Sequence, residues 1–404
     1  MKFGILHETK VPADQRSPLS PQQLAKLKQS FPGVEFLVQH SDLREFTDEE
    51  FRQKGLMVTD DLSDCDILLG VKEVDIDTLL KGKTYMFFSH TAKMQPHNQK
   101  LLMRMAELGI TLIDYEYLET NSERIVAFGH WAGIAGAYTC LMGMGEISKR
   151  YSLLPASGLH TISDLHMQLN KVDLPQEFKA IVTGEGRVAG GVIEVLEKAG
   201  FIRAEPDEFL EDTPRGQVYC QLGPQHYYYN PGRDEYSHAH FKAHGIDYIA
   251  DFFKYAKHGE LLIAGHFWDG KSPALLTVEQ LQQLVPKLVM IADISCDING
   301  LIASTIRTST IESPFYGFDP VTGNEIAPFN PEKITVMAVD NLPTMLPRES
   351  SVDFGSDLMN IVLPELLNKR NSMIIDRATI LRKGVLTPRF QYLQYYLDGK
   401  SGIE

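Results

Sequence analysis

The chain has 404 residues and a formal net charge of -14 at pH 7. This length predicts two or three domains, with enough chain for two hydrophobic cores. The acidic balance and the lack of a basic block argue against a nucleic acid or an anionic membrane as partner. No apolar run approaches the roughly 18 residues of a membrane span, and the first residues do not form a signal sequence. We therefore expect a soluble, unexported, cytoplasmic protein.

The four cysteines are Cys65, Cys140, Cys220 and Cys296. They stand far apart, without a C-x-x-C pair and without metal-ligand spacing. We expect free thiols in a reducing cytosol and no bound metal.

The first part of the chain alternates apolar runs with helical patterns. Ser20 and Pro21 are typical of an N-cap and a first helical residue, and Thr47 with Glu50 predicts a capping box. Strands are predicted over residues 3–6, 34–38, 66–71, 85–88 and 110–113, and a further helix over 97–108. Strands alternating with helices indicate an open, parallel α/β sheet.

Titratable side chains follow several of these strands. In open α/β sheets, ligands bind beyond the carboxyl ends of the strands. A lysine and a histidine with carboxylate neighbours are suited to amine chemistry, because carboxylates adjust their pKa values toward the working pH. The alternative, a solvated sheet edge, remains open for each of them. These residues are Lys72, Glu73, His90, Asp114 and Glu116.

Residues 129–145 are rich in glycine and alanine. We predict a close-packed helix that joins two domains, since small residues permit close approach. Residues 219–255 are crowded with Tyr and His and are predicted to interrupt the second domain. Within them His226, His238 and His240 lack a metal spacing, so surface or packing roles are favoured.

Residues 180–200 carry a glycine motif between a predicted strand and a helix. Gly184, Gly186 and Ala189 have the G-x-G-x-x-G/A spacing of dinucleotide-binding turns, with Arg187 and Val188 in the first helical turn. The free N–H groups of that turn can face a pyrophosphate. About 20 residues on, Glu205 follows the short apolar run 201–204, which we predict as the second strand. An ordinary strand-to-helix turn is the alternative.

Later strands are predicted over residues 261–264, 288–291 and 334–339, and the second is followed by Asp293 and Asp297. Tail helices near 357–367 and 376–382 are expected to return to the first domain. We predict a substrate-binding domain of residues 1–137 plus 340–404 and a dinucleotide-binding Rossmann domain of residues 138–339.

Several longer segments resemble one family. Val71-Lys72-Glu73 is one of them, and the others are GKTYMFFSHTAKMQPHN, IDYEYLE, RIVAFGHWAGIAG, ADISCDING and AVDNLPTMLPRESS. Together they resemble the lysine-forming saccharopine dehydrogenases, especially the lysine-ketoglutarate reductase half of the bifunctional enzymes. The start, GILHETKVPADQRSPLSP, is similar to the alanine dehydrogenase and transhydrogenase N-terminal pattern.

The resemblance implies two Rossmann-like, doubly wound parallel-sheet domains with a cleft between them. It implies oxidation of the secondary amine of saccharopine to L-lysine and 2-oxoglutarate, or the reverse reductive condensation. The catalytic groups it implies are Lys72 and His90. The implied substrate-binding residues are Arg16, Glu73, Glu116, Arg124 and Asp297, and the cofactor-binding residues are Gly184, Gly186, Arg187, Val188, Glu205 and Asp293.

The cofactor is expected to be NAD or NADP. Glu205 favours NAD, because a carboxylate bonds the ribose 2′-hydroxyl and repels a 2′-phosphate. The Tyr/His-rich segment is similar to the bifunctional enzymes, which use NADPH, so NADP remains open. An alanine dehydrogenase-like enzyme and a non-catalytic dinucleotide-binding regulator are the alternatives in function.

Overall fold

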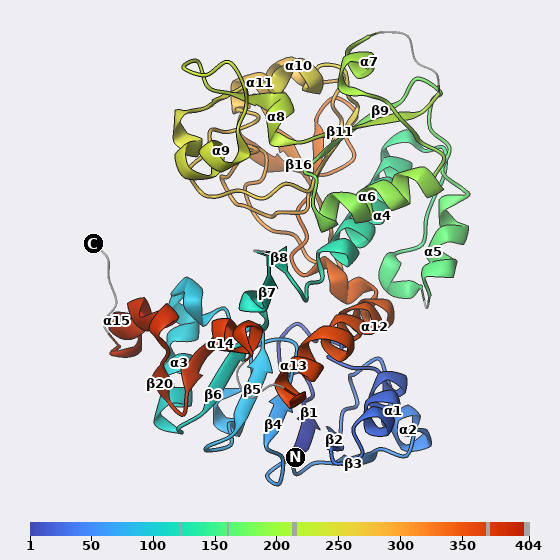
Figure 1. Cartoon of the computed structure of the whole chain (residues 1–404). Coiled ribbons are helices and arrows are strands. Elements are labelled where there is room, and N and C mark those ends of the chain that lie inside the picture. The colour runs from blue at the N-terminus through green and yellow to red at the C-terminus, as the bar shows by residue number, and fades with distance from the viewer. Residues whose placement is uncertain (122, 160, 212–215, 369–371, 400–404) are drawn as a thin grey trace. The chain divides into compact units, whose positions relative to one another are not determined.

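The computed structural model describes residues 1–121, 123–159, 161–211, 216–368 and 372–399. It divides into two compact units. Unit 1 comprises Met1–Phe128 and Pro347–Glu404, and unit 2 comprises Gly129–Leu346. Each unit contains its own eight-stranded, mostly parallel sheet with helices against it (Figure 1). The α/β class predicted from the sequence is confirmed.

The unit 1 sheet has the strand order β20-β19-β6-β5-β4-β1-β2-β3. The strands from β6 to β3 are parallel, and β19 and β20 add an antiparallel edge. The strands are β1 (Lys2–Ile5), β2 (Glu35–Gln39), β3 (Met57–Thr59), β4 (Ile67–Leu69), β5 (Thr84–Phe87), β6 (Thr111–Asp114), β19 (Thr379–Arg382) and β20 (Val385–Leu386). A separate hairpin pairs β7 (Glu119–Thr120) with β8 (Glu123–Arg124).

The helices of unit 1 are α1 (Pro21–Ser30), α2 (Asp48–Gln53), α3 (Gln99–Glu107), α12 (Pro347–Asp357), α13 (Leu363–Asn368), α14 (Met373–Ala378) and α15 (Gln394–Leu397). The predicted helix starts are confirmed, since Ser20 caps α1 and Thr47 forms a capping box with Glu50 at α2. The predicted tail helix over 376–382 is wrong in its second half. From Thr379 the chain is β19, because its buried apolar residues pair with β6.

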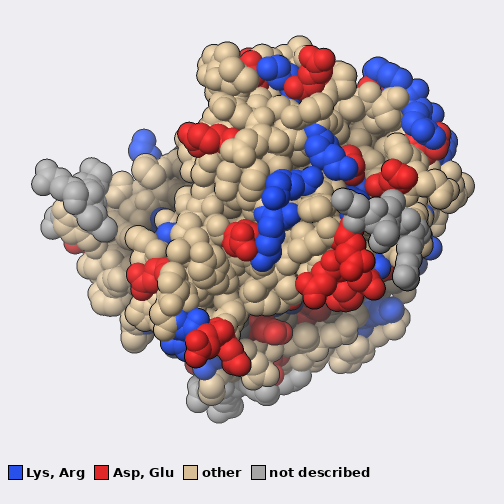
Figure 2. All heavy atoms as spheres, turned by 90° about the horizontal axis from the view of Figure 1, so that it is seen from above, with Lys and Arg blue, Asp and Glu red and all other residues tan. Residues whose placement is uncertain are grey.

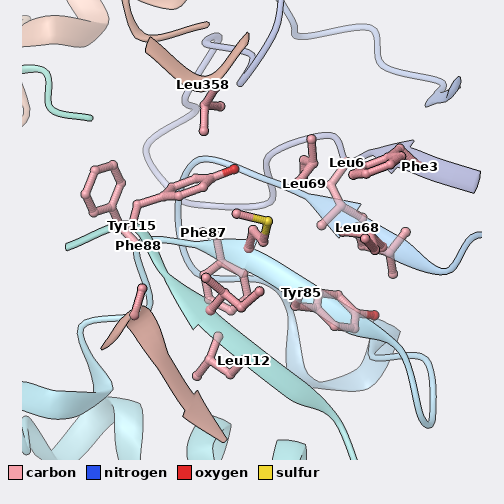
Figure 3. Close-up of a cluster of buried hydrophobic side chains, with 14 of the residues drawn as sticks. Phe3, Leu6, Leu68, Leu69, Tyr85, Phe87, Phe88, Leu112, Tyr115 and Leu358 are labelled. Carbon is pink, nitrogen blue, oxygen red and sulfur yellow. The ribbon is translucent and has the colours of Figure 1, made fainter. Parts of the chain in front are cut away.

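The core of unit 1 fills both faces of this sheet. Figure 3 shows Phe87 and Leu112 below the strands and Tyr115 with Leu358 above them. Leu68, Phe87 and Leu112 are fully buried. Strands covered on both faces are apolar throughout, and such a sheet is a rigid base for the loops that leave its carboxyl edge.

The unit 2 sheet has the order β10-β11-β9-β14-β15-β18-β16-β17, with β16 and β17 antiparallel to their neighbours. Its strands are β9 (Lys179–Thr183), β10 (Ile202–Arg203), β11 (Val218–Leu222), β14 (Leu261–Ala264), β15 (Met290–Asp293), β16 (Phe315–Asp319), β17 (Asn324–Ile326) and β18 (Ile334–Met337). A small hairpin pairs β12 (Tyr228–Tyr229) with β13 (Ile249–Ala250). The helices are α4 (Gly129–Ser148), α5 (Ile162–Leu169), α6 (Arg187–Lys198), α7 (Pro206–Leu210), α8 (Pro224–Tyr227), α9 (His238–His244), α10 (Phe253–Ala256) and α11 (Val278–Leu284).

The lateral order on one side of β9 differs from the sequence-based expectation. The predicted second strand is β10, a two-residue edge strand. The strand on that side of β9 is β11, and residues 219–222 of β11 fall within the segment 219–255 that is predicted to interrupt the domain. The prediction of an interruption is wrong for residues 219–222, because they are paired in the sheet with β9 and both Tyr219 and Cys220 are buried there.

Helix α4 packs closely on α6 within unit 2. A Cβ at Gly133 would lie 2.0 Å from the carbonyl oxygen of Val188, and one at Gly191 would lie 2.1 Å from that of His130. The close packing predicted for residues 129–145 is therefore confirmed. All of α4 lies in unit 2, which begins at Gly129 and ends at Leu346.

Among the described residues, no helix is both long enough and apolar enough to cross a bilayer. Figure 2 shows positive and negative side chains in small groups of both signs on the face drawn. The four cysteines are unpaired, and Cys65, Cys140 and Cys220 are buried.

Candidate active site

The candidate residues of unit 1 gather at the carboxyl edge of its sheet. Lys72 and Glu73 follow β4, His90 follows β5, and Asp114 ends β6. The order β6-β5-β4-β1 makes these strands direct neighbours. Adjacent strands are about 4.8 Å apart, so residues that leave them at the same edge come within reach of one another.

Glu73 and His90 form a hydrogen-bonded pair. The Oε1 atom of Glu73 lies 2.5 Å from Nδ1 of His90, and its Oε2 atom lies 3.7 Å from Nζ of Lys10. Burial alone would raise the pKa of Glu73, but the hydrogen bond and the charge of His90 hold it at about 2. Glu73 is thus ionised at neutral pH, and it orients the imidazole so that Nε2 is left for other partners.

Lys72 lies in a partly buried position beside this pair. Burial lowers the pKa of its ammonium group, and the nearby positive charges of Arg16 and Lys10 lower it further, against the opposing charges of Glu73 and Asp14. A lowered pKa brings a lysine closer to the neutral form that can accept a proton.

Glu8, which the sequence analysis did not select, supports the backbone of Lys72. Its two carboxylate oxygens accept hydrogen bonds from the N–H groups of Val71 and Lys72, both at 2.7 Å. Burial and the negative charge of Asp14 raise the pKa of Glu8 to about 8. The signal available in the sequence was an acidic residue two positions after the first predicted strand.

Tyr115 lies close to this carboxyl group. Its buried hydroxyl has no hydrogen-bond partner within the described part of the chain. Burial and the charges of Glu8 and Asp114 raise the pKa of Tyr115 well above its ordinary value, so the hydroxyl stays protonated.

The ends of β5 and β6 are tied together through Asp114. Its carboxylate accepts hydrogen bonds from the N–H and the hydroxyl of Ser89, at 3.0 and 2.5 Å, and from the N–H of Glu116 at 2.8 Å. Glu116 in turn pairs with Lys93 at 3.1 Å and Arg124 at 2.9 Å. Burial opposes ionisation of Glu116, but these two cations lower its pKa. Glu116 and Arg124 therefore lie in one charged group at this edge.

Arg16 is a buried arginine in the loop after β1. Its guanidinium makes a two-bond ion pair with Asp14, at 2.9 and 2.5 Å, and lies 4.2 Å from the ring centroid of Phe128. Arg16 is only 2% exposed, so its position is fixed by packing as well as by charge. A cavity of about 340 Å³ lies beside Glu73, lined by Thr9, Lys10, Glu73, Val74, Asp75, His97 and Asn98.

The glycine motif of unit 2 forms the predicted turn between β9 and α6. Gly184 has a φ of 101°, and a Cβ there would lie 2.6 Å from the carbonyl oxygen of Gly265, so only glycine fits. A Cβ at Gly186 would meet no described atom within 4 Å, so protein packing does not require this glycine. Its backbone is open for close approach by a phosphate, and the residues present fit a dinucleotide.

The remaining cofactor candidates differ in their surroundings. Arg187 opens α6 and is exposed, whereas Val188 lies against Gly129 and Gly265. Glu205 is exposed and pairs with Arg203 at 3.5 Å, behind the edge strand β10. Its assignment rested on β10 lying beside β9, and β11 occupies that position.

Asp293 is the last residue of β15, Asp297 follows in the loop, and the two aspartates have different surroundings. Asp293 is buried and accepts hydrogen bonds from Ser295, Cys296 and Thr305, which shape the following loop. Asp297 is partly buried, and burial together with the charge of Asp293 raises its pKa. No cluster of three or more His, Cys, Asp or Glu side chains that could hold a metal was found among the described residues.

Comparison with known proteins shows which families this chain is similar to. Residues 4–135 match the family model of the alanine dehydrogenase/PNT N-terminal domain. The chain is 31% identical to an alpha-aminoadipic semialdehyde synthase of Arabidopsis thaliana, over 96% of this chain and 41% of that protein. It is 26% identical to a saccharopine dehydrogenase [NAD(+), L-lysine-forming] of Neurospora crassa, over 90% of this chain and 91% of that protein.

The chain spans less than half the length of the alpha-aminoadipic semialdehyde synthases that it matches. In fold it is similar to a solved L-alanine dehydrogenase, with a TM-score of 0.67 and 15% identity over 99% of this chain and all of that one. The chain therefore belongs to the alanine dehydrogenase and transhydrogenase superfamily, and within it to the group formed by the saccharopine dehydrogenases and the matching part of the alpha-aminoadipic semialdehyde synthases.

Proposed function

We propose that this protein is an NAD(P)-dependent oxidoreductase that acts on the secondary amine of saccharopine. It would yield L-lysine and 2-oxoglutarate, or run in reverse as a reductive condensation. Membership in the superfamily supports the dinucleotide-dependent oxidoreductase class. The choice of saccharopine rests on relatives of 25 to 31% identity, among them saccharopine dehydrogenases.

One observation carries the proposal: Lys72 and His90 leave neighbouring parallel strands at one sheet edge, and the carboxylate of Glu73 is held against His90. The pKa of Lys72 is lowered mainly by burial, and His90 is fixed by its 2.5 Å contact with Glu73. Two oriented groups that can take up or give up a proton are what amine oxidation and imine hydrolysis require.

The reaction needs proton transfers at substrate nitrogen and oxygen. A bound nicotinamide would supply the hydride acceptor for the α-carbon of the glutarate part of the substrate, and loss of that hydride leaves an imine between this carbon and the amine nitrogen. Lys72 and His90 then serve as acid and base while water adds to the imine carbon. The base removes the hydroxyl proton of the resulting carbinolamine, its C–O bond becomes the carbonyl of 2-oxoglutarate as the C–N bond breaks, and lysine leaves with a proton from the acid on its nitrogen. Glu73 keeps His90 in position throughout these steps.

Charges at the same edge support recognition of an amino-acid substrate. Arg16 and Arg124 are the cations we assign to substrate carboxylates, because guanidinium groups match carboxylates geometrically. The Oε2 atoms of Glu73 and Glu116 are buried and have no hydrogen-bond donor among the described residues. A substrate ammonium group would supply the missing donors. We also propose Asp297 as a substrate contact.

We further propose that unit 1 binds the amino-acid substrate and that unit 2 binds the dinucleotide through Gly184, Gly186, Arg187 and Val188. Asp293 would contribute indirectly, by shaping the loop that follows β15. A cytoplasmic location is part of the proposal. It is supported by the unpaired cysteines, since structural disulfides mark oxidising compartments.

The test is a turnover assay of the full chain that follows reduced-nicotinamide absorbance. Saccharopine, L-alanine, and lysine with 2-oxoglutarate are each supplied with both dinucleotides. Lys72→Met and His90→Gln should each lower turnover of saccharopine by about 100 to 10,000-fold and retain dinucleotide binding. Each should also flatten one limb of the pH–rate profile.

The outcomes separate the alternatives. Turnover of alanine alone would identify an alanine dehydrogenase-like enzyme. Dinucleotide binding without turnover of any of these substrates would indicate a regulator. Parental turnover and an unaltered pH profile in both variants would show that the pair is structural.

A further inference from the structure

The topology of unit 2 changes which side chain can reach the adenosine ribose of a bound dinucleotide. In Rossmann folds an acidic group at the end of the strand beside the glycine-motif strand bonds the ribose 2′-hydroxyl. That neighbouring strand is β11 here. Glu205 follows β10, which is two strands from β9, a lateral distance of about 10 Å.

The end of β11 is joined directly to the glycine turn. The N–H of Gly184 donates to the carbonyl of Leu222 at 2.9 Å, and Nε2 of Gln221 donates to the carbonyl of Gly184 at 3.0 Å. The carboxyl end of β11 is therefore adjacent to the position where the backbone of the motif would meet the pyrophosphate.

A carboxylate already lies at this junction, and it comes from the motif itself. Glu185 stands between Gly184 and Gly186, and its Oε1 atom accepts a hydrogen bond from Nε2 of Gln225 at 2.8 Å. A Cβ at Gly223 would lie only 2.4 Å from the carboxyl group of Glu185. The glycine after β11 thus leaves room for Glu185 to lie across the strand end, and Gln225 holds it there.

We infer that Glu185, rather than Glu205, is the residue that distinguishes the 2′-hydroxyl of NAD from the 2′-phosphate of NADP, and that the chain prefers NAD. The Glu185 carboxylate accepts a hydrogen bond from the hydroxyl and repels the phosphate. This inference rests on the proposed dinucleotide site, but it does not depend on the amino-acid substrate.

The experiment measures dissociation constants of the full chain for NADH and NADPH by titration, without amino-acid substrate. The parent should bind NADH more tightly. Glu185→Gln removes the charge at nearly constant shape. It should reduce the ratio of the NADPH to the NADH dissociation constant by about tenfold or more, because it weakens a charged hydrogen bond and ends a like-charge repulsion.

Two further variants make the test specific. Glu205→Gln is the matched control, since it removes an exposed carboxylate behind β10 and should leave the ratio unchanged. Gly223→Ala keeps the charge of Glu185 but displaces its carboxylate, because alanine tolerates the φ of -86° and its Cβ occupies the space that the carboxylate fills. Gly223→Ala should raise the dissociation constant for NADH severalfold. Circular-dichroism melts confirm that each variant is folded.

An unchanged ratio in Glu185→Gln would overturn the inference, and so would a ratio that Glu205→Gln shifts equally far. A parent that binds neither dinucleotide would overturn both the inference and the proposed cofactor site. If the ratio shifts as expected while saccharopine is not turned over, the inference stands and only the proposed substrate fails.

Discussion

Replacing Glu8 with glutamine should change how the stability of unit 1 depends on pH. Glu8 is partly buried, and its oxygens accept hydrogen bonds from the N–H groups of Val71 and Lys72. Burial, assisted by the charge of Asp14, raises its pKa from 4.5 to about 8 despite these two hydrogen bonds. The native protein therefore holds a proton on Glu8 at neutral pH that the unfolded chain has lost.

The sign and size of the effect follow from proton linkage. A raised pKa contributes stability that is complete below pH 4.5 and is lost as the pH rises to about 8. Between these limits the free energy of unfolding falls by about 1.4 kcal/mol for each pH unit, or about 5 kcal/mol in all. In Glu8→Gln this slope disappears. A constant loss of about 1 to 3 kcal/mol remains, because the amide offers one acceptor oxygen to two N–H donors.

The assay compares denaturant unfolding of the parent and Glu8→Gln at a series of pH values from 5 to 9. Both tryptophans, Trp131 and Trp268, lie in unit 2. Tryptophan fluorescence therefore follows the unfolding of unit 2. Circular dichroism follows both units, so a transition seen by circular dichroism but not by fluorescence is the unfolding of unit 1. The variant should lose stability more slowly than the parent as the pH rises. Parallel pH curves for the two proteins would refute the assigned ionisation of Glu8.

Three further predictions concern the glycine turn, the helix contact and the buried arginine. Gly186→Val should abolish NADH binding measured by titration while the melt is retained, since a branched side chain blocks the backbone that a phosphate approaches; parental affinity would exclude this turn as the site. Gly191→Ala should destabilise unit 2 by about 1 to 3 kcal/mol or more, because its Cβ would lie 2.1 Å from the carbonyl oxygen of His130. The control is Gly190→Ala, whose Cβ would meet only a His130 side-chain atom at 4.0 Å. It should stabilise α6 by about 0.5 to 1 kcal/mol in chemical denaturation. Equal changes in stability for Gly190→Ala and Gly191→Ala would contradict the packing argument. Arg16→Lys should raise the KM for saccharopine about tenfold with little change in dinucleotide affinity, since lysine lacks the two-bond geometry toward a carboxylate, and an unchanged KM would show that Arg16 serves only Asp14.

Features that depend on adjacent residues were predictable from the sequence. The capping box of Thr47 and Glu50 forms as expected, because both partners lie within one turn of α2. The turn at Gly184 also forms as expected, since an apolar strand, a positive φ and an amphipathic helix follow one another along the chain. Residues 261–264 form a strand with the predicted limits.

Features that depend on burial were harder to recognise. In the sequence, nothing distinguishes Glu8 from other charged residues that follow a short strand. Its altered pKa arises because β1 lies beside β4 and because Asp14 and Arg16 fold back over it, contacts that join residues far apart in the chain. Tyr115 is similar, since only the folded sheet encloses its hydroxyl.

The lateral order of the strands is the feature that local sequence predicts least well. The choice between Glu185 and Glu205 as the residue that contacts the ribose depends on this order. Spacing along the chain selects Glu205, because it follows the next apolar run after the glycine motif. Spacing across the sheet selects the end of β11, because β11 and not β10 forms hydrogen bonds to β9. Val218 to Leu222 is a buried strand whose Tyr and Cys resemble the polar, aromatic segment that follows it, so periodicity alone does not separate the two. The position of β11 explains why residue 223 is glycine, since a Cβ there would collide with the carboxyl group of Glu185. It also explains the hydrogen bond from Gln225 to Glu185. The carboxylate of Glu185 therefore lies at the strand end where the ribose is expected.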